Sequence, residues 1–518
     1  MFGASFGIIS QALEIYRKSL DIRNRNVINA NDPDYVEENP VVKSFAPVGI
    51  NFEEVRRDQN IYYLNLRNEK LSLVKYLEGR NDALASVEGM FQELFEGSGV
   101  IDYTGRFYTS YMDLMKEPTN EGARGSLYES ARALVDFIKT RGRDIDKLDQ
   151  TLDFGLRRAV DRANELIRKI HAVNMEITVM YAQTYARGRD YKNFLDMRDR
   201  YIRELSELIN VTVQEDKIGR VKVITSKGFV LVDFMDSYRE LEYAGGRIWW
   251  GTTDITDVIR SGDIKALLDT REDLSRFKGK LDDFAKQLIS EVKLPREGSG
   301  TWYLIQNVPD PTVPVSSFGI EGTLEFYDGS TLLGTIDYGP LSLSDLETLI
   351  NSDPTLTAAG FSATLITNPD GTYTLRIDNS SPSRSVRDTG ANFYESSPVF
   401  VGSGLADIEV APTLRSDLED IDFSLAAVFS SFASGWWDRS EELINLLISD
   451  ISTTRADVRD ELRIESALLE SIDRKVKEMQ GVSIDKEFME IMKIQRTYEA
   501  VARIVQTIDE LLETTLSM

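Results

Sequence analysis

The sequence predicts an α+β protein: an elongated, mostly α-helical bundle with paired N- and C-terminal coiled-coil helices, a small β patch and an inserted mixed α/β domain. No proline occurs between Pro118 and Pro295 or after Pro412, whereas ten lie from Pro295 to Pro412. Because proline in a helix interior costs about 3 kcal/mol, the proline-free stretches predict long helices. Turn residues cluster in the proline-rich region, and apolar residues at both chain ends follow a helical spacing.

Those apolar residues recur at steps of three and four, the spacing of a coiled-coil seam. The predicted assembly seam consists of Phe6, Ile9, Leu13, Tyr16, Leu20 and Val27 near one end and Ile491, Ile494, Tyr498, Val501, Val505, Ile508 and Leu512 near the other. Burial of the C-terminal set contributes about 10 to 20 kcal/mol, but ordering a helix of about 35 residues costs more. Each terminal helix therefore needs a partner, and the other one is the nearest candidate. The alternative is that both are ordinary core helices of a bundle.

Between the ends, the elements follow from changes in pattern. Residues 32–47 are expected to form an extended connector with three prolines, and helical patterning runs from Val55 to Phe95 and again from Ser126. Three valine-rich runs separated by glycines predict a β patch at 211–232. Apolar residues at helical spacing predict a helix over 263–292.

The region from Gly298 to Arg415 differs from the rest. It contains four arginines, no lysine and fourteen acidic residues, a net charge of −10. Turn residues at Asp328-Gly329 and at Asn368-Pro369-Asp370-Gly371 predict two hairpins, and 344–351 predicts a short helix. The expected domains are 1–40 with 478–518 as a terminal coiled-coil assembly domain, 41–298 with 412–477 as a helical bundle carrying a β patch near 211–260, and 299–411 as an inserted acidic, β-rich domain.

Composition excludes several classes of function. The net charge of −25 disfavours nucleic acid and anionic membranes as partners. The absence of cysteine removes disulfides and thiolate metal sites, and no run of 18 apolar residues predicts a membrane span. The N-terminus lacks the basic leader of a signal peptide, so no cleaved signal is expected.

The few residues that could act in catalysis or ligand binding are better explained by structural roles. His171 is the only histidine, so no histidine-based triad or histidine-rich metal site can form. Asp196 and Asp199 could form an acid–base pair, but ion pairing with Arg198, Arg200 and Arg203 is favoured because the charges alternate. The pairs Trp249-Trp250 and Trp436-Trp437 could stack on sugars, but core packing is favoured. No catalytic, cofactor-binding or metal site is therefore predicted.

Motifs at both ends and in the middle resemble a known family. The runs from Asn26 to Tyr35 and from Gly481 to Leu512 are similar to the terminal signatures of flagellar axial proteins. Internal segments narrow this resemblance to the flagellar hook-associated protein 1 family; they are Gly49 with Val55 and Arg57, Pro118 with Arg124, 195–199, 204–208, 256–262 and 267–271, with Glu272 where the family usually has Asp. The resemblance covers nearly the whole chain and is weakest at 298–322.

The resemblance implies an extracellular structural subunit at the junction between hook and filament, not an enzyme, and without cofactors. It also implies export by the flagellar type III apparatus and assembly as a ring. The implied partners are copies of the chain, hook protein, hook-associated protein 3 and an export chaperone on the C-terminal segment. Two alternatives remain: a hook or distal rod subunit, which the helical region 195–292 argues against, and a carbohydrate-binding or carbohydrate-active protein that uses residues 298–415.

Overall fold

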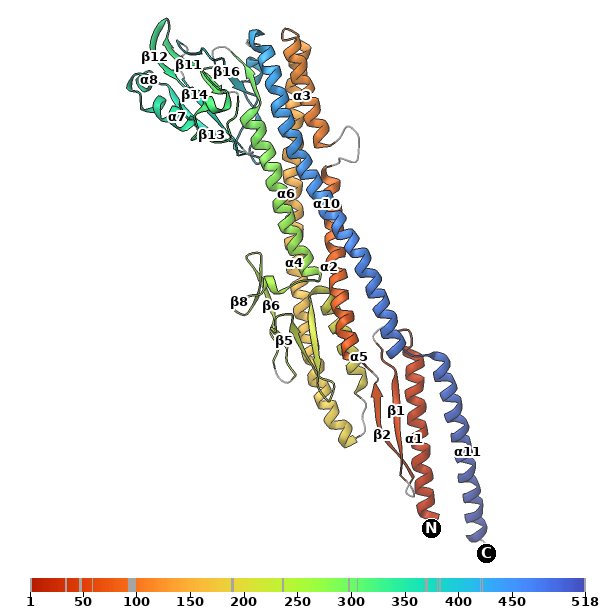
Figure 1. The fold of residues 1–518 in the computed structure, drawn as a ribbon. Helices are drawn as coiled ribbons and strands as arrows, with labels where there is room; N and C mark the ends of the chain where they lie inside the picture. Colours follow the sequence, from red (N-terminus) through yellow and green to blue (C-terminus); the bar gives the residue numbers. More distant parts are fainter. Residues whose placement is uncertain are drawn as a thin grey trace. The chain divides into compact units, whose positions relative to one another are not determined.

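The computed structural model describes residues 2–516 except 33–34, 46–48, 58, 92–98, 188–190, 235–236, 297–298, 305, 369–370, 380, 382, 420 and 422. The chain forms two compact units: unit 1 comprises 1–81, 153–269 and 458–518, and unit 2 comprises 82–152 and 270–457. Four long helices, α2 (Ile61–Phe91), α4 (Glu121–Arg187), α6 (Asp263–Glu291) and α10 (Ala426–Gln480), contribute residues to both units (Figure 1). The mostly helical fold with small sheets agrees with the sequence prediction. The three-domain division does not coincide with these units and stays a prediction.

The two chain ends lie together in unit 1. Helix α1 (Phe2–Asn29) contacts α11 (Ile484–Leu516), and Figure 1 shows the two running antiparallel, with both termini at the same end of the pair. Strands β1 (Glu38–Phe45) and β2 (Gly49–Arg57) form an antiparallel hairpin that also contacts α1. Helix α1 therefore has two neighbours: the hairpin that follows it in the sequence and α11 from the other end of the chain.

This hairpin corrects two sequence predictions. Residues 38–45 of the expected connector form a strand, and Val55 belongs to β2, so the next helix begins only at Ile61. Pro40 is compatible with β1 because this two-stranded sheet consists of edge strands, where a missing N–H is tolerated. The expected helix end near Phe95 lies outside the described residues.

The rest of unit 1 packs two small sheets against helices. After α5 (Lys192–Leu208), the first sheet has the order β3-β4-β5 and the second β6-β7-β8. Their strands are Val211–Glu215, Val221–Thr225, Val230–Val232, Leu241–Ala244, Arg247–Trp250 and Thr253–Asp254, followed by a 3-10 turn at Thr256–Val258. Alternate valines of β3 and β4 are buried in one core with α4 residues from Leu156 to Ile170. The predicted β patch is confirmed, and the second sheet extends it.

Unit 2 contains a helix that the sequence did not reveal. Helix α3 (Val100–Lys116) begins after Gly99, and α4 begins at Glu121 rather than near Ser126. Trp436 of α10 is 3% exposed and packs against Phe107 and Tyr111 of α3. The core interpretation of Trp436 is therefore confirmed.

The proline-rich region of unit 2 has its own core. A five-stranded sheet has the order β13-β14-β10-β16-β9, and a three-stranded sheet has the order β12-β11-β15. The elements are β9 (Lys293–Pro295), β10 (Thr301–Leu304), a 3-10 turn (Val315–Phe318), β11 (Thr323–Asp328), β12 (Thr331–Asp337), α7 (Leu343–Ser352), α8 (Pro354–Ala358), β13 (Ser362–Thr367), β14 (Tyr373–Asp378), β15 (Arg384–Asp388) and β16 (Phe393–Pro398). The chain then continues through β17 (Phe400–Val401), β18 (Glu409–Val410), α9 (Leu414–Asp417) and a 3-10 turn (Phe423–Leu425) to α10. One cluster of buried side chains runs from Trp302 to Phe393. Both predicted hairpins and the short helix are present.

Candidate assembly interface

The predicted assembly seam lies on the two terminal helices that contact each other. Ile491 is buried, Tyr498 is 38% exposed, and Ile9, Leu13, Tyr16, Leu20, Val27, Ile494, Val501, Val505 and Ile508 are half-buried. The side chains of Phe6 and Leu512 lie outside the described part. The most buried apolar positions of α1 are instead Ile15 and Ile22, at 4% and 3% exposure. The structure thus brings the two halves of the seam onto neighbouring helices, and their role in assembly stays a prediction.

A buried ion pair joins the two helices across 464 residues of sequence. Arg23 Nη1 of α1 lies 2.7 Å from Glu487 Oε1 of α11, and the Glu487 side chain is fully buried. Arg23 Nη1 also lies 3.7 Å from Glu37, which pairs with Lys486 at 3.0 Å. Removing one partner of a buried pair leaves an uncompensated charge, which is strongly destabilising. This pair therefore fixes the register of α1 against α11.

Asn26 fastens the end of α1 to the hairpin. Its fully buried side chain accepts a hydrogen bond from the Glu38 backbone N–H at 3.0 Å and donates one to the Glu38 carbonyl at 2.9 Å. The Tyr35 hydroxyl donates to the same Asn26 oxygen at 2.8 Å. One amide side chain thereby satisfies both backbone groups of Glu38, as a neighbouring strand would. In the motif that resembles axial proteins, Asn26 and Tyr35 thus have a structural role, whereas Asp34, which stands where that motif usually has Gly, lies outside the described residues.

A second charged cluster fastens the other strand of the hairpin to α5. Arg57 Nη2 of β2 lies 2.6 Å from Asp196 and 3.3 Å from Asp199, and Gln59 donates to Asp199 at 2.8 Å. Arg198, 1% exposed, pairs with Asp199 at 2.6 Å and donates to the Gly219 carbonyl. Ion pairing at Asp196 and Asp199 is therefore confirmed, but the partners are corrected. Arg57 takes the place of Arg200 and Arg203, which pair with Asp32 and Glu207.

The pKa values of the two carboxyl groups in this cluster, Asp196 and Asp199, shift in opposite directions. Burial raises the pKa of Asp196 to about 7 against the attraction of Arg57, and the neighbouring charge of Asp199 adds to the rise. Burial acts in the same direction at Asp199, but Arg198 and Arg57 together outweigh it and lower its pKa. Asp199 is thus the charged partner of the two arginines at neutral pH, and Asp196 titrates near neutrality.

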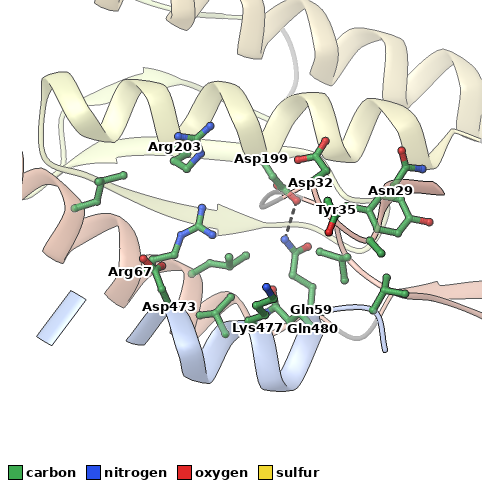
Figure 2. A pocket seen from close by; sticks show the side chains of 18 of the residues that line it. Asn29, Asp32, Tyr35, Gln59, Arg67, Asp199, Arg203, Asp473, Lys477 and Gln480 are labelled. Atoms are coloured by element: carbon green, nitrogen blue, oxygen red, sulfur yellow. Dashed lines mark hydrogen bonds between the residues drawn. The ribbon is translucent and has the colours of Figure 1, made fainter. Parts of the chain in front are cut away.

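A cavity of about 390 Å³ lies beside these contacts in unit 1. It is lined by Asn29, Ala30, Asn31, Asp32, Tyr35, Val36, Gln59, Leu64, Arg67, Leu71, Asp199, Arg203, Leu469, Asp473, Val476, Lys477, Gln480, Gly481 and Val482. Figure 2 shows charged side chains of both signs around it and the hydrogen bond from Gln59 to Asp199. Gln480 is 4% exposed, and its amide nitrogen has no hydrogen-bond partner among the described residues.

His171 and the pair Trp249-Trp250, the remaining candidates for chemistry, pack against other rings or bond to the backbone. The ring of His171 lies 5.0 Å from that of Tyr238, centroid to centroid. Trp250 packs against Phe229, and the Trp249 indole donates to the Ala244 carbonyl at 3.2 Å. In the described part of the chain, no group of three acidic, histidine or cysteine residues is placed to hold a metal ion, and no helix is long and apolar enough to cross a bilayer.

Comparisons with known proteins show that the chain is similar to flagellar proteins. Residues 84–294 match the family model of the flagellar hook-associated protein FlgK helical domain. Residues 476–518 match that of the flagellar basal body rod FlgEFG protein C-terminal region. Flagellar hook-associated protein 1 of Escherichia coli (strain K12) is 19% identical over 506 residues, which are 91% of this chain and 90% of that protein. The chain is similar to flagellar hook-associated protein 1 along most of its length.

These similar proteins differ widely in sequence from the chain. Flagellar hook-associated protein 1 of Bacillus subtilis (strain 168) is 22% identical over 249 residues, 44% of this chain and about half (48%) of that protein. The solved structure of the flagellar hook junction protein FlgK from Burkholderia pseudomallei is 16% identical and covers 69% of this chain and 66% of its own, with a TM-score of 0.42. That score is too low to establish a common fold, so the likeness rests on sequence. The family is structural rather than enzymatic.

Proposed function

We propose that the chain is a structural subunit of the bacterial flagellum that polymerises at the hook-filament junction and links the hook to the filament. The observation that carries this proposal is the antiparallel pair of terminal helices, joined by Arg23 and Glu487, in a chain similar to hook-associated protein 1 along 91% of its length. A subunit built this way presents one continuous rod made from both ends of its sequence. Such rods pack side by side in a tube by a contact that repeats around an axis.

The finer features of the proposal rest on the resemblance to flagellar hook-associated protein 1. The terminal helices act as a coiled-coil assembly domain, residues 41–298 with 412–477 as a helical body, and residues 299–411 as an inserted domain. The partners are copies of the chain in a ring, hook protein, hook-associated protein 3 and an export chaperone on the C-terminal segment. The chain reaches the extracellular flagellum through the type III apparatus, which suits a protein without disulfides.

Two alternatives are less well supported. A hook or distal rod subunit would share the C-terminal match at 476–518, but the match at 84–294 is to the helical domain of the hook-associated protein. A carbohydrate-binding function would use the region 298–415, where the buried tryptophan Trp302 belongs to the core and offers no stacking surface. A glycan array with the purified chain tests this alternative.

The proposal is tested by deleting the gene and complementing it with seam variants. The deletion strain is expected to build hooks without filaments, as seen by electron microscopy, and wild-type chain restores the filaments. Ile494→Asp places a charge on the half-buried seam and is expected to abolish this rescue, whereas Gln495→Asp adds the same charge at the neighbouring exposed position and is expected to retain it. Normal filaments in the deletion strain would refute the proposed function. Full rescue by Ile494→Asp would instead remove the seam from the contact.

A further inference from the structure

Helix α11 carries a second apolar face that no part of the described chain covers. Ile484, Phe488 and Met492, which we call the outer stripe, follow one another at four-residue steps and are 40%, 51% and 50% exposed. Residues four apart lie on one side of a helix. Glu487 and Ile491, on the side that meets α1, are 0% and 8% exposed. A helix with apolar residues on two faces needs two partners, and α1 supplies only one of them.

The cavity in unit 1 has the size and lining to accept side chains of this kind. Its aliphatic lining residues are Ala30, Val36, Leu64, Leu71, Leu469, Val476 and Val482. An apolar cavity of about 150 Å³ is large enough for benzene, so 390 Å³ accommodates a phenyl ring together with a flexible neighbour. Gln480, whose amide nitrogen has no acceptor among the described residues, adds a buried N–H donor to this lining. The thioether sulfur of Met492 is a weak acceptor that such a donor can use.

The cavity and the outer stripe also resemble each other in charge, because equal numbers of acidic and basic residues line the cavity and flank the stripe. The cavity is lined by three basic residues, Arg67, Arg203 and Lys477, and three acidic ones, Asp32, Asp199 and Asp473. Apart from the buried Glu487, the charged residues of α11 between 484 and 493 are Asp485, Lys486, Glu490 and Lys493, again with equal numbers of acidic and basic side chains. In a chain with a net charge of −25, most pairs of surfaces on two copies repel each other. These two locally neutral surfaces can approach without that cost.

We propose that the outer stripe of one copy binds in the unit 1 cavity of a second copy, with the Phe488 ring on the apolar lining. The stripe and the cavity are different surfaces of the same chain, so the contact is heterologous. Every copy that accepts a stripe still presents its own, and such a contact continues into a ring or a helical tube. This inference rests on the proposed function, because it specifies which surfaces of neighbouring copies meet.

Site-directed cross-linking tests the contact directly. The chain has no cysteine, so single substitutions give an unambiguous signal. A strain that co-expresses differently tagged Phe488→Cys and Leu469→Cys chains is expected to yield a disulfide-linked heterodimer in purified hook-filament structures. The control pair is Ile28→Cys with Leu469→Cys, because Ile28 is 78% exposed on α1 and belongs to neither surface. Dominant Phe488→Cys homodimers would show stripe packing on stripe, and cross-links to hook protein would show another occupant. Either result, or a yield no higher than the control, overturns the proposal.

An assembly assay separates this inference from the proposed function. Phe488→Asp is expected to keep the wild-type melting temperature, because the side chain is half exposed, but to weaken assembly by about 30-fold or more, as loss of an interface anchor does. Gln495→Asp is the control of equal charge on the same helix and is expected to assemble normally. If filaments require the chain but Phe488→Asp rescues as well as Gln495→Asp, only the inference fails. If filaments form without the chain, the proposed function fails.

Discussion

The ion pair between Arg23 and Glu487 offers a quantitative test of what holds the chain ends together. In Arg23→Met, the carboxylate of Glu487 remains fully buried and loses its partner at 2.7 Å. Breaking a buried pair from one side costs about 3 to 5 kcal/mol. In Glu487→Gln, the neutral amide oxygen still accepts a hydrogen bond, and Arg23, 11% exposed, retains Glu37 at 3.7 Å. Loss of the charge alone costs about 1 to 2 kcal/mol. Arg23→Met is thus expected to destabilise the helix pair more than Glu487→Gln does.

Hydrogen exchange resolved by peptide is the appropriate assay, because α1 and α11 can separate without unfolding the rest of the chain. Arg23→Met is expected to accelerate exchange in both helices by about 100-fold or more, and Glu487→Gln by about 10-fold. Exchange in the core from Trp302 to Phe393 is expected to stay unchanged. The control is Lys493→Met, which breaks an exposed pair with Glu490 on the surface of α11.

A double variant provides the decisive comparison. Arg23→Met with Glu487→Leu replaces both charges by apolar groups, and such replacements are often neutral. The double variant is therefore expected to exchange more slowly than Arg23→Met alone. If the double variant exchanges faster than either single variant, or if Arg23→Met matches Lys493→Met, the pair does not fix the helices and the reasoning is refuted.

Three further predictions concern separate features of the fold. The carboxyl pKa of Asp196 rises from an unfolded value near 4 to about 7, so this group binds its proton more tightly in the folded chain. The stability of the wild type should therefore fall as pH rises from 5 to 8, and Asp196→Asn should gain about 1 kcal/mol or more of stability relative to wild type across that range in melting experiments. Asn26→Ala leaves the backbone groups of buried Glu38 unpaired and should cost about 2 to 4 kcal/mol in urea unfolding, whereas Asn29→Ala, which loses only a bond to the Arg25 carbonyl, should cost far less. Residues 299–411 expressed alone should melt cooperatively with a β-rich circular dichroism spectrum, since their core runs from Trp302 to Phe393; a random-coil spectrum would contradict this boundary.

The elements that the sequence predicted correctly are those whose signal is local. The hairpins around Asp328-Gly329 and at 362–378 follow from turn residues between short apolar runs, and the helix at 343–352 has a Ser342 cap paired with Asp345. The helix over 263–292 follows from apolar spacing alone. In each case a few adjacent residues decide the structure.

The hairpin at 38–57 could not be predicted because its stability comes from elsewhere. Pro40 and the acidic residues around Glu53-Glu54 argue against a strand, and Val55 lies in an amphipathic pattern that fits a helix equally well. The structure fixes the strands through Asn26 of α1, which binds Glu38 at a separation of 12 positions, and through Asp196 of α5, which pairs with Arg57 at a separation of 139 positions. Tertiary contacts thus override weak local preferences.

The same distinction explains which parts of the candidate interface were found and which were missed. A seam is periodic, so its residues were visible in the sequence, but the partners of Arg23, Arg57 and Asn26 lie 464, 139 and 12 positions away and carry no periodic signal. The outer stripe is periodic too, yet Ile484, Phe488 and Met492 stand out only once α1 is seen to cover the neighbouring face of α11, which carries Glu487 and Ile491. A helix can satisfy one apolar face within its own chain by a buried ion pair and close packing. Its second face then favours association with other copies, to a degree that rises with their concentration.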